Sequence, residues 1–238
     1  MRNLRDIWVY LSASPLLHLT LTLIAYQIGL AVYRRAGLNP LLNPVVIAVL
    51  LLLAVLIGTG TPYETYFQGA QFVHFLLGPA TVALAIPLYR QFQVVRQSAG
   101  AIFVSILAGS LTASISAVAI AWMLGASQDT LLSIAPKSVT APVAMGIAER
   151  LGGLPSLTAV LVILTGILGA MLGTYTMNLL GVRNWAARGF AMGTASHGLG
   201  TARALQVNET AGAFAGLAMG LNALATALIL PLLWRLLF

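Results

Sequence analysis

Eight apolar segments follow one another along the chain and constrain its fold more than any other feature. They lie at about residues 15–33, 41–60, 71–89, 99–125, 130–148, 155–181, 189–205 and 211–238. A helix needs about 20 apolar residues to cross the hydrocarbon core of a bilayer, and most of these segments approach that length. The pattern predicts an all-α fold, a polytopic integral membrane protein with about seven or eight hydrophobic segments.

The composition agrees, because 59% of the residues are hydrophobic and only 7% are charged, whereas soluble domains carry about 25% charged residues. The segments leave no room for a separate soluble domain, so residues 1–238 are expected to form a single multi-pass domain in the cytoplasmic membrane. The net charge of +7 does not indicate nucleic-acid binding, because the arginines occur singly or in pairs between segments, as juxtamembrane anchors do. The chain has no cysteine, which excludes disulfides and thiolate metal sites.

The first segment is expected to be retained rather than cleaved as a signal peptide. Arg2 and Arg5 precede its apolar run, but the run ends in Val-Tyr-Arg-Arg at residues 32–35 and not in the small residues of a cleavage site. Residues 1–13 contain a tryptophan and a tyrosine, which favour headgroup depth. They are predicted to form an interfacial helix.

Three segments carry helix breakers near their middle, and we expect them to be broken or re-entrant. Non-helical backbone at membrane depth is tolerated only where it is buried in protein or lines a wet cavity, because lipid cannot hydrogen-bond to the freed N–H and C=O groups. The three interruptions are therefore predicted to converge on an interior site. The breakers are Gly78-Pro79 in the third segment, Pro136 and Pro142 in the fifth, and Gly193, Gly198 and Gly200 in the seventh.

A weak internal repeat accompanies these interruptions. A shift of 57 positions places Pro79 on Pro136 and Gly109 on Gly166. Residues 70–125 and 127–182 are therefore candidate repeat units of the kind found in transporters, although chance matches in an apolar chain explain the same pairs.

The distribution of charge suggests an orientation. A loop expected at residues 58–70 has no lysine or arginine, so it is predicted to be external. Arg90 and Arg96 then face the cytoplasm if the third segment crosses, and re-entry of the fifth segment places Arg183 and Arg188 on the same side.

Lys137 is the only lysine in the chain, and it lies in an apolar run between two prolines. A lysine at the bilayer centre costs about 2.5–3.5 kcal/mol on insertion scales, so it persists where it meets water, a partner or an anion. The prolines break the helix and expose N–H groups whose positive dipole end attracts an anion. The alternative is that Lys137 snorkels to the interface. The candidate anion-binding residues here are Lys137, Ser138 and Thr140, between Pro136 and Pro142.

The run from Gly193 to Arg203 forms the second candidate site, because it crowds glycines, hydroxyls, an imidazole and a guanidinium into a short stretch. Arg203 could clamp a carboxylate through two parallel hydrogen bonds, and glycine permits close approach of the backbone. The alternative is that the hydroxyls bond only to their own helix and that the histidine is satisfied in the interior. The candidate ligand residues are Thr194, Ser196, His197, Thr201 and Arg203.

Enzymatic motifs are missing from the sequence. There are no paired intramembrane carboxylates, no His-Glu-x-x-His, no Gly-x-Ser-x-Gly and no phosphate loop. Ser196 and His197 lack the acid that would orient a catalytic histidine. We therefore expect no enzymatic activity, no cofactor and no metal site. Asn43-Pro44 and Gly78-Pro79 are explained as a helix start and a kink.

At its two motifs the chain resembles the LrgB/CidB family. That family shares a Pro-Lys-Ser-Val/Ile-Thr-x-Pro run, found here at residues 136–142. It also shares an Arg-Gly-x-Ala-x-Gly-Thr-Ala-Ser-His-x-x-Gly-Thr-Ala-Arg run, found here at residues 188–203. The resemblance extends from about Asn39 to the C-terminus and includes Leu42-Asn43-Pro44.

The resemblance implies one of two functions. The first is transport of small monocarboxylates such as pyruvate, 3-hydroxypropionate or, in plastid relatives, glycolate and glycerate. The second is antiholin-like modulation of murein hydrolase activity and autolysis. It also implies pairing with a small LrgA/CidA-like membrane protein.

We favour the carrier, because the residues that match the motifs are anion-binding types at membrane depth. In this hypothesis both candidate sites face each other around one carboxylate, and His197 exchanges a proton near neutral pH. The competing hypothesis is an antiholin-like scaffold in the lipid bilayer that regulates pore formation without moving substrate. An oligomer is expected. The residues assigned to helix breaks and support are Asn43, Pro44, Pro79, Pro136, Pro142, Gly193, Gly198 and Gly200.

Overall fold

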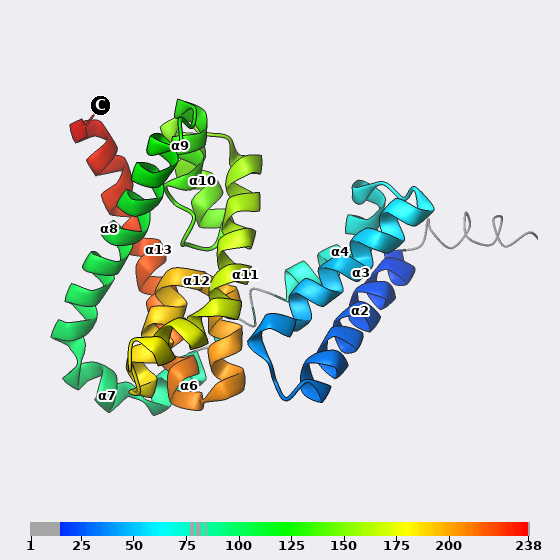
Figure 1. The fold of residues 1–238 in the computed structure, drawn as a ribbon, viewed down its shortest axis with the longest axis horizontal. Coiled ribbons are helices and arrows are strands. Elements are labelled where there is room, and N and C mark those ends of the chain that lie inside the picture. Colours follow the sequence, from blue (N-terminus) through cyan, green and yellow to red (C-terminus); the bar gives the residue numbers. More distant parts are fainter. Residues whose placement is uncertain (1–14, 77–78, 80–81, 84, 238) are drawn as a thin grey trace, which may run out of the picture. The chain divides into compact units, whose positions relative to one another are not determined.

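The computed structural model of the chain describes residues 15–237 except 77, 78, 80, 81 and 84, so the predicted interfacial helix at residues 1–13 lies outside the described part. The described residues are mostly helical and include no strand, which confirms the all-α prediction. Their contacts group into two compact units, an N-terminal unit at Met1–Ala83 and a C-terminal unit at Leu84–Phe238 (Figure 1). That residues 1–238 form a single membrane domain remains a prediction.

The N-terminal unit is built around its first described helix, which packs against both α-helices that follow it in this unit. The unit contains α2 (Pro15–Arg35), the short 3-10 turn η1 (Pro40–Leu42), α3 (Pro44–Thr59) and α4 (Tyr63–Phe75). The expectation of a loop at residues 58–70 was wrong, because α4 already begins at Tyr63. The mixture of aromatic and polar residues in α4 does not show the apolar run expected of a membrane helix, yet the segment is helical and packs on α2.

Specific contacts explain how α2 holds its two neighbours. A Cβ at Gly69 of α4 would overlap the Pro15 carbonyl oxygen, so the absence of a side chain allows this approach. The hydroxyls of Thr22 and Tyr66 lie 3.0 Å apart. The helix start predicted at Asn43-Pro44 is confirmed, since Asn43 Oδ1 accepts a hydrogen bond from the Val45 N–H at 2.8 Å.

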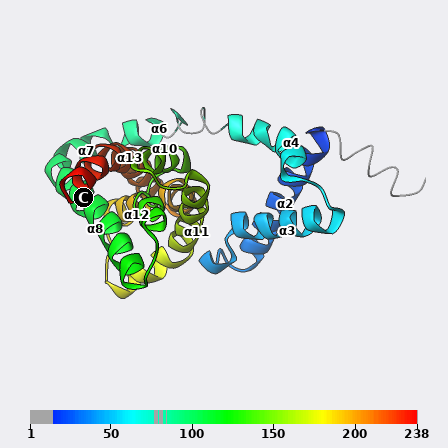
Figure 2. The same cartoon turned by 90° about the horizontal axis from the view of Figure 1, so that it is seen from above.

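The C-terminal unit contains three long helices, α8, α11 and α13, arranged around α12 (Figure 2). Together with α2, these are the four described helices that are long and apolar enough to cross a membrane. This number is lower than the seven or eight hydrophobic segments expected, because α3 has only 16 residues and the fifth and seventh segments are each divided into two shorter arms. The helices of this unit are α6 (Ala85–Arg90), α7 (Phe92–Gln97), α8 (Ala99–Met123), α9 (Gln128–Ile134), α10 (Ala141–Leu151), α11 (Pro155–Leu179), α12 (Trp185–Val207) and α13 (Glu209–Leu237).

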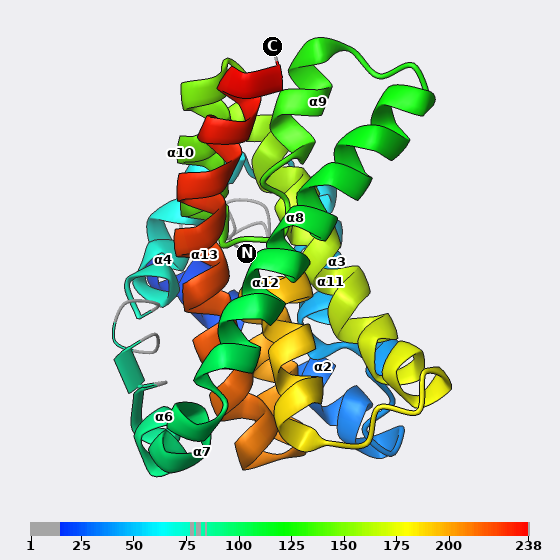
Figure 3. The same cartoon turned by 90° about the vertical axis from the view of Figure 1, so that its left-hand side faces the viewer.

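The fifth apolar segment is a hairpin made of α9 and α10, with an irregular tip at residues 135–140. The residues that follow α10 lie beside the end of α9. Leu154 N–H donates to Ser133 Oγ at 2.8 Å, and Thr158 Oγ1 donates to the Ser133 carbonyl at 3.0 Å. Both arms lie in the upper part of the C-terminal unit, and their tip reaches its middle (Figures 1 and 3).

The seventh segment, α12, turns back on itself at His197. This residue has φ 41° and ψ −129°, which no helix contains. A Cβ at Gly200 would lie 2.5 Å from the carbonyl oxygen of Met192, although eight residues of continuous helix would separate them by about 12 Å. The predicted break is therefore confirmed, and α12 consists of two arms, residues 185–196 and 198–207.

The first arm of α12 runs beside α13 in the same direction. A Cβ at Gly189 would overlap the Ala211 carbonyl, and one at Gly193 would overlap the Ala215 carbonyl, so equal steps of four residues match on both helices. Gly193 thus serves close helix packing and not the break itself. The two hairpins enter the C-terminal unit from opposite ends and bring their tips together near its middle (Figure 3).

The break predicted in the third segment stays a prediction, because most of the residues between Phe75 and Ala85 fall outside the described part of the chain. Pro79 lies between them, while Gly78 falls outside the described residues. The two glycines that the proposed repeat superimposes both face α12, with Gly109 against Thr194 and Gly166 against His197. This equivalence supports the repeat, which stays a prediction.

Candidate functional site

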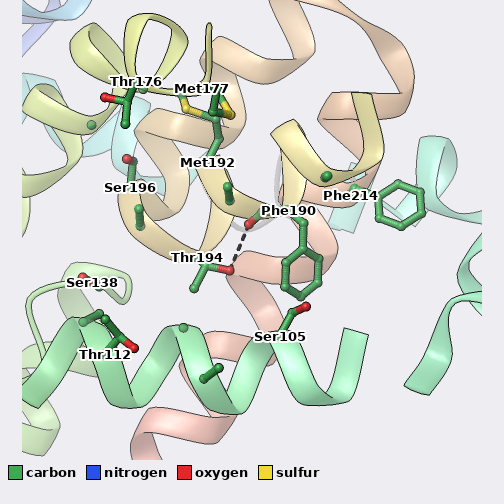
Figure 4. Close-up of a pocket in the computed structure, with 18 of the residues that line it drawn as sticks. Ser105, Thr112, Ser138, Thr176, Met177, Phe190, Met192, Thr194, Ser196 and Phe214 are labelled. Carbon is green, nitrogen blue, oxygen red and sulfur yellow. Dashed lines mark hydrogen bonds between the residues drawn. The ribbon is translucent and has the colours of Figure 1, made fainter. Parts of the chain in front are cut away.

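A cavity of about 1160 Å³ lies in the C-terminal unit, between α8, α11, the first arm of α12 and the tip of the α9–α10 hairpin (Figure 4). Its wall on α8 extends from Ser98 to Ala113, about 22 Å along the helix axis. Thr112 of α8 and Ser138 of the hairpin tip both line this cavity (Figure 4). The lining carries eight hydroxyl groups, those of Ser98, Ser105, Thr112, Ser138, Thr165, Thr176, Thr194 and Ser196.

Lys137 is the one charged residue among the described residues that line this cavity. Its side chain is half-buried, and Nζ donates to Ser138 Oγ at 3.2 Å. The ion pair found in the described part of the chain joins Arg90 to Glu209, and no described carboxylate lies within 4.0 Å of Lys137. An ammonium group has three donors, so further donors remain for a ligand in the cavity. This placement favours an anion site over snorkelling to the interface.

Ser196 supplies a second free donor. Its side chain is 1% exposed, and within the described structure its hydroxyl has no hydrogen-bond partner. Leaving a buried hydroxyl unpaired costs about 1–3 kcal/mol. Because Ser196 lines the cavity, a bound anion would remove this cost.

The hydroxyl of Thr194 is partly used by its own helix. Oγ1 donates to the Phe190 carbonyl at 2.9 Å, as the alternative interpretation of these hydroxyls expected (Figure 4). Its oxygen still faces the cavity wall and can accept a hydrogen bond.

The other predicted site residues lie outside the cavity lining. His197 Nε2 lies 2.9 Å from the carbonyl oxygen of Val162, and Thr201 Oγ1 donates to the His197 carbonyl at 2.8 Å. Thr140 caps α10 through its backbone, and Arg203 is buried on the second arm of α12 with 9% exposure. The structure therefore brings Lys137, Ser138, Thr194 and Ser196 to one cavity, whereas Thr140, His197, Thr201 and Arg203 are not among its lining residues.

Glycines of α11 determine how closely the α12 tip approaches that helix. A Cβ at Gly166 would lie 2.5 Å from His197 Cε1, and a Cβ at Gly169 would overlap Ser196 Oγ. In a sequence, glycines within an apolar segment indicate close helix packing but not the partner. Here they make room for the two residues that form the turn of α12.

Asn222 on α13 is a site residue that sequence reasoning missed. Its Nδ2 donates to the carbonyl oxygens of Ser138 at 3.1 Å and Thr194 at 3.0 Å, so it contacts both hairpins. An amide in the middle of a long apolar helix is itself a signal, because polar groups at membrane depth are rarely retained without a role.

The chemistry of the lining suits an anion. Hydroxyls and an ammonium group donate hydrogen bonds, whereas carboxylates, imidazoles and thiolates, the usual protein ligands of metals, do not occur among the described lining residues. No group of three or more His, Asp or Glu side chains in the described structure is placed to hold a metal ion.

Comparison with known proteins gives a consistent result over nearly the whole chain. The profile of the LrgB-like family matches residues 22–236. YxaC of Bacillus subtilis (strain 168) is 40% identical over 212 residues, which cover 89% of this chain and 92% of that protein. The holin-like protein CidB of Staphylococcus epidermidis is 33% identical over 224 residues, covering 94% of this chain and 96% of that protein. The holin-like protein CidB of Staphylococcus aureus is 31% identical over 218 residues, covering 92% and 95%. No solved structure matches the chain.

Proposed function

Since this chain belongs to the LrgB-like family of membrane proteins, we propose that it is a secondary carrier of small monocarboxylates such as pyruvate, 3-hydroxypropionate or glycolate. The observation that carries the proposal is Lys137, an ammonium without a described carboxylate partner, in a hydroxyl-lined cavity. A substrate carboxylate would accept hydrogen bonds from Lys137 Nζ and from the free hydroxyl of Ser196.

The number of charges in the cavity suggests the class of substrate. One ammonium balances one carboxylate, whereas a second carboxylate would be left without a countercharge among the described lining residues. The proposal therefore favours monoanions over dianions. His197, Thr201 and Arg203 would act by shaping the α12 turn, or would reach the substrate in another conformation of the carrier.

The two opposed hairpins suggest how access could alternate. The cavity wall begins near Ser98 and Asn184. Three arginines are adjacent to these residues in the sequence: Arg96 in the last turn of α7, Arg183 in the connection before α12, and Arg188 in the first turn of α12. Arginine-rich connections favour the cytoplasmic side. In this proposal the described conformation is open to the cytoplasm, and movement of the hairpin tips exposes the same site to the opposite side.

A non-transporting scaffold is the second candidate function. It is supported by the relatives named holin-like protein CidB. In that case the protein would act on the bilayer through a small LrgA/CidA-like partner, in an oligomer, and the cavity would be a packing defect. Both candidates place the protein in a bacterial cell membrane.

Reconstitution separates the two candidates. The purified protein, alone and together with an LrgA/CidA-like partner, is placed in liposomes, and uptake of labelled pyruvate is measured against labelled succinate and alanine. The carrier predicts saturable uptake of pyruvate that unlabelled 3-hydroxypropionate inhibits and succinate does not. Uptake of none of these compounds in either preparation, or equal uptake of all three, contradicts the carrier and favours a scaffold or a pore.

A further inference from the structure

Asn222 occupies the centre of α13 and is almost completely buried. It is the fourteenth residue of the helix, about 20 Å from its start, and its side chain is 1% exposed. An amide at this depth costs free energy unless its hydrogen bonds are made inside the protein. Both of the hydrogen bonds recorded for its amino group are made to backbone carbonyl oxygens.

Each of these carbonyls belongs to an interrupted stretch of backbone. In a continuous helix the Ser138 carbonyl would accept from residue 142, but residue 142 is a proline and has no N–H. The Thr194 carbonyl lies in the turn of α12 that ends at His197, where the backbone leaves helical geometry. Asn222 therefore donates to one carbonyl whose usual helical donor is replaced by a proline and to a second carbonyl in the last turn before the break at His197.

The two carbonyls lie on different hairpins, and both parent residues line the cavity. Ser138 is on the tip of the α9–α10 hairpin, and Thr194 is on the first arm of α12. Asn222 itself is not among the lining residues. Through its amide nitrogen, Asn222 thus connects the backbones of two residues that line the cavity, although its own side chain does not line it.

We propose that Asn222 is a positioning residue, which ties the two re-entrant tips together and thereby sets the geometry in which Lys137 and Ser196 bind a carboxylate. This inference rests on the proposed carrier function for its transport consequence, but the tie between the hairpins exists independently of substrate. A side chain of similar size without N–H groups loses both of these hydrogen bonds and allows the tips to separate. A glutamine at this position would keep the N–H donors, but its extra methylene group would shift them relative to the two carbonyls.

Two substitutions of similar length test the role of the amide. Asn222→Leu removes the donors with an apolar side chain that the membrane tolerates, and Asn222→Gln keeps them. Thr226→Val is the matched control, because Thr226 lies one turn further along α13 and its recorded hydrogen bond, at 2.8 Å, is with the hydroxyl of buried Ser110 on α8 and not with either tip. Each protein is compared with the wild type by amide hydrogen exchange and by concentration-dependent uptake of labelled pyruvate in liposomes.

Asn222→Leu is expected to speed exchange about tenfold at the amides of both tips, residues 137–140 of the α9–α10 tip and residues 193–198 of α12, and to raise the KM for pyruvate about tenfold with a smaller change in Vmax. Asn222→Gln should bring the KM to within about threefold of the wild type. Thr226→Val should alter neither the tips nor the KM. Wild-type exchange in either tip of Asn222→Leu, or equal effects of Thr226→Val, overturns the proposal. Absence of pyruvate uptake by the wild type refutes the carrier function alone, and hydrogen exchange then still decides whether Asn222 ties the tips.

Discussion

Replacing Lys137 with methionine should abolish most anion binding without weakening the fold. Methionine preserves the length of the side chain and removes the ammonium. The lysine makes one recorded hydrogen bond, to Ser138 Oγ at 3.2 Å, and pairs with no described carboxylate. Removing an unpaired charge from membrane depth relieves a desolvation cost. The unfolding temperature should therefore stay the same or rise.

The loss of affinity follows from the single countercharge. Two unit charges 4 Å apart attract by about 4 kcal/mol at an effective dielectric constant of 20. Lys137 is half-buried and lines a cavity, so water reduces this value, and a net contribution of about 1.5–3 kcal/mol is typical of a hydrogen bond to a charged group. The dissociation constant for pyruvate should rise about 10- to 150-fold.

Equilibrium binding of labelled pyruvate to purified protein measures this change directly. Arg150→Met is the control, because Arg150 is an exposed cation at the end of α10 in the same hairpin and does not line the cavity. Lys137→Arg keeps the charge and should retain part of the affinity. If Lys137→Met binds pyruvate within threefold of the wild type, the ammonium is not the countercharge and the reasoning fails.

Two further pairs of variants test the contacts of the α12 turn. Gly169→Ala should lower the free energy of unfolding by about 1–3 kcal/mol, because its Cβ would overlap Ser196 Oγ. The control Gly146→Ala, which has nothing within 4 Å of the new Cβ, should be neutral or stabilising. Equal unfolding temperatures of the two variants in detergent would contradict the close packing of α11 and α12. His197→Ala and His197→Gly both lose the contact with the Val162 carbonyl, but only glycine is unstrained at φ 41°. The glycine variant should therefore be more stable by about 1–2 kcal/mol, and thermal unfolding that ranks alanine above glycine would rule out strain at this turn.

Local chemistry made much of the fold predictable. The apolar segments at 99–125 and 155–181 correspond closely to α8 and α11, because the length of a helix in lipid depends mainly on the hydrophobicity of its own residues. The breaks near Pro136 and within residues 193–200 were also predictable, since proline and clustered glycines act on the adjacent backbone. The start of α4 was not, because its residues are amphipathic and form a helix by packing on α2.

The composition of the candidate site shows where sequence reasoning ends. Both motifs contribute to one cavity, but Lys137 lines it and Arg203 does not. Asn222 was missed, although it contacts both hairpins. These outcomes depend on which side of each helix faces which neighbour, and residues distant in the sequence determine that.

The sequence by itself determined an all-helical membrane protein with interrupted segments and two motifs rich in hydrogen-bond donors, because hydropathy and helix breaking are properties of neighbouring residues. Only the tertiary structure decided which donors share a cavity and which are used by the fold. Close packing is the physical reason: the glycines of α11 and the amide of α13 position the two tips, and a shift of one residue on either helix would place different side chains between them.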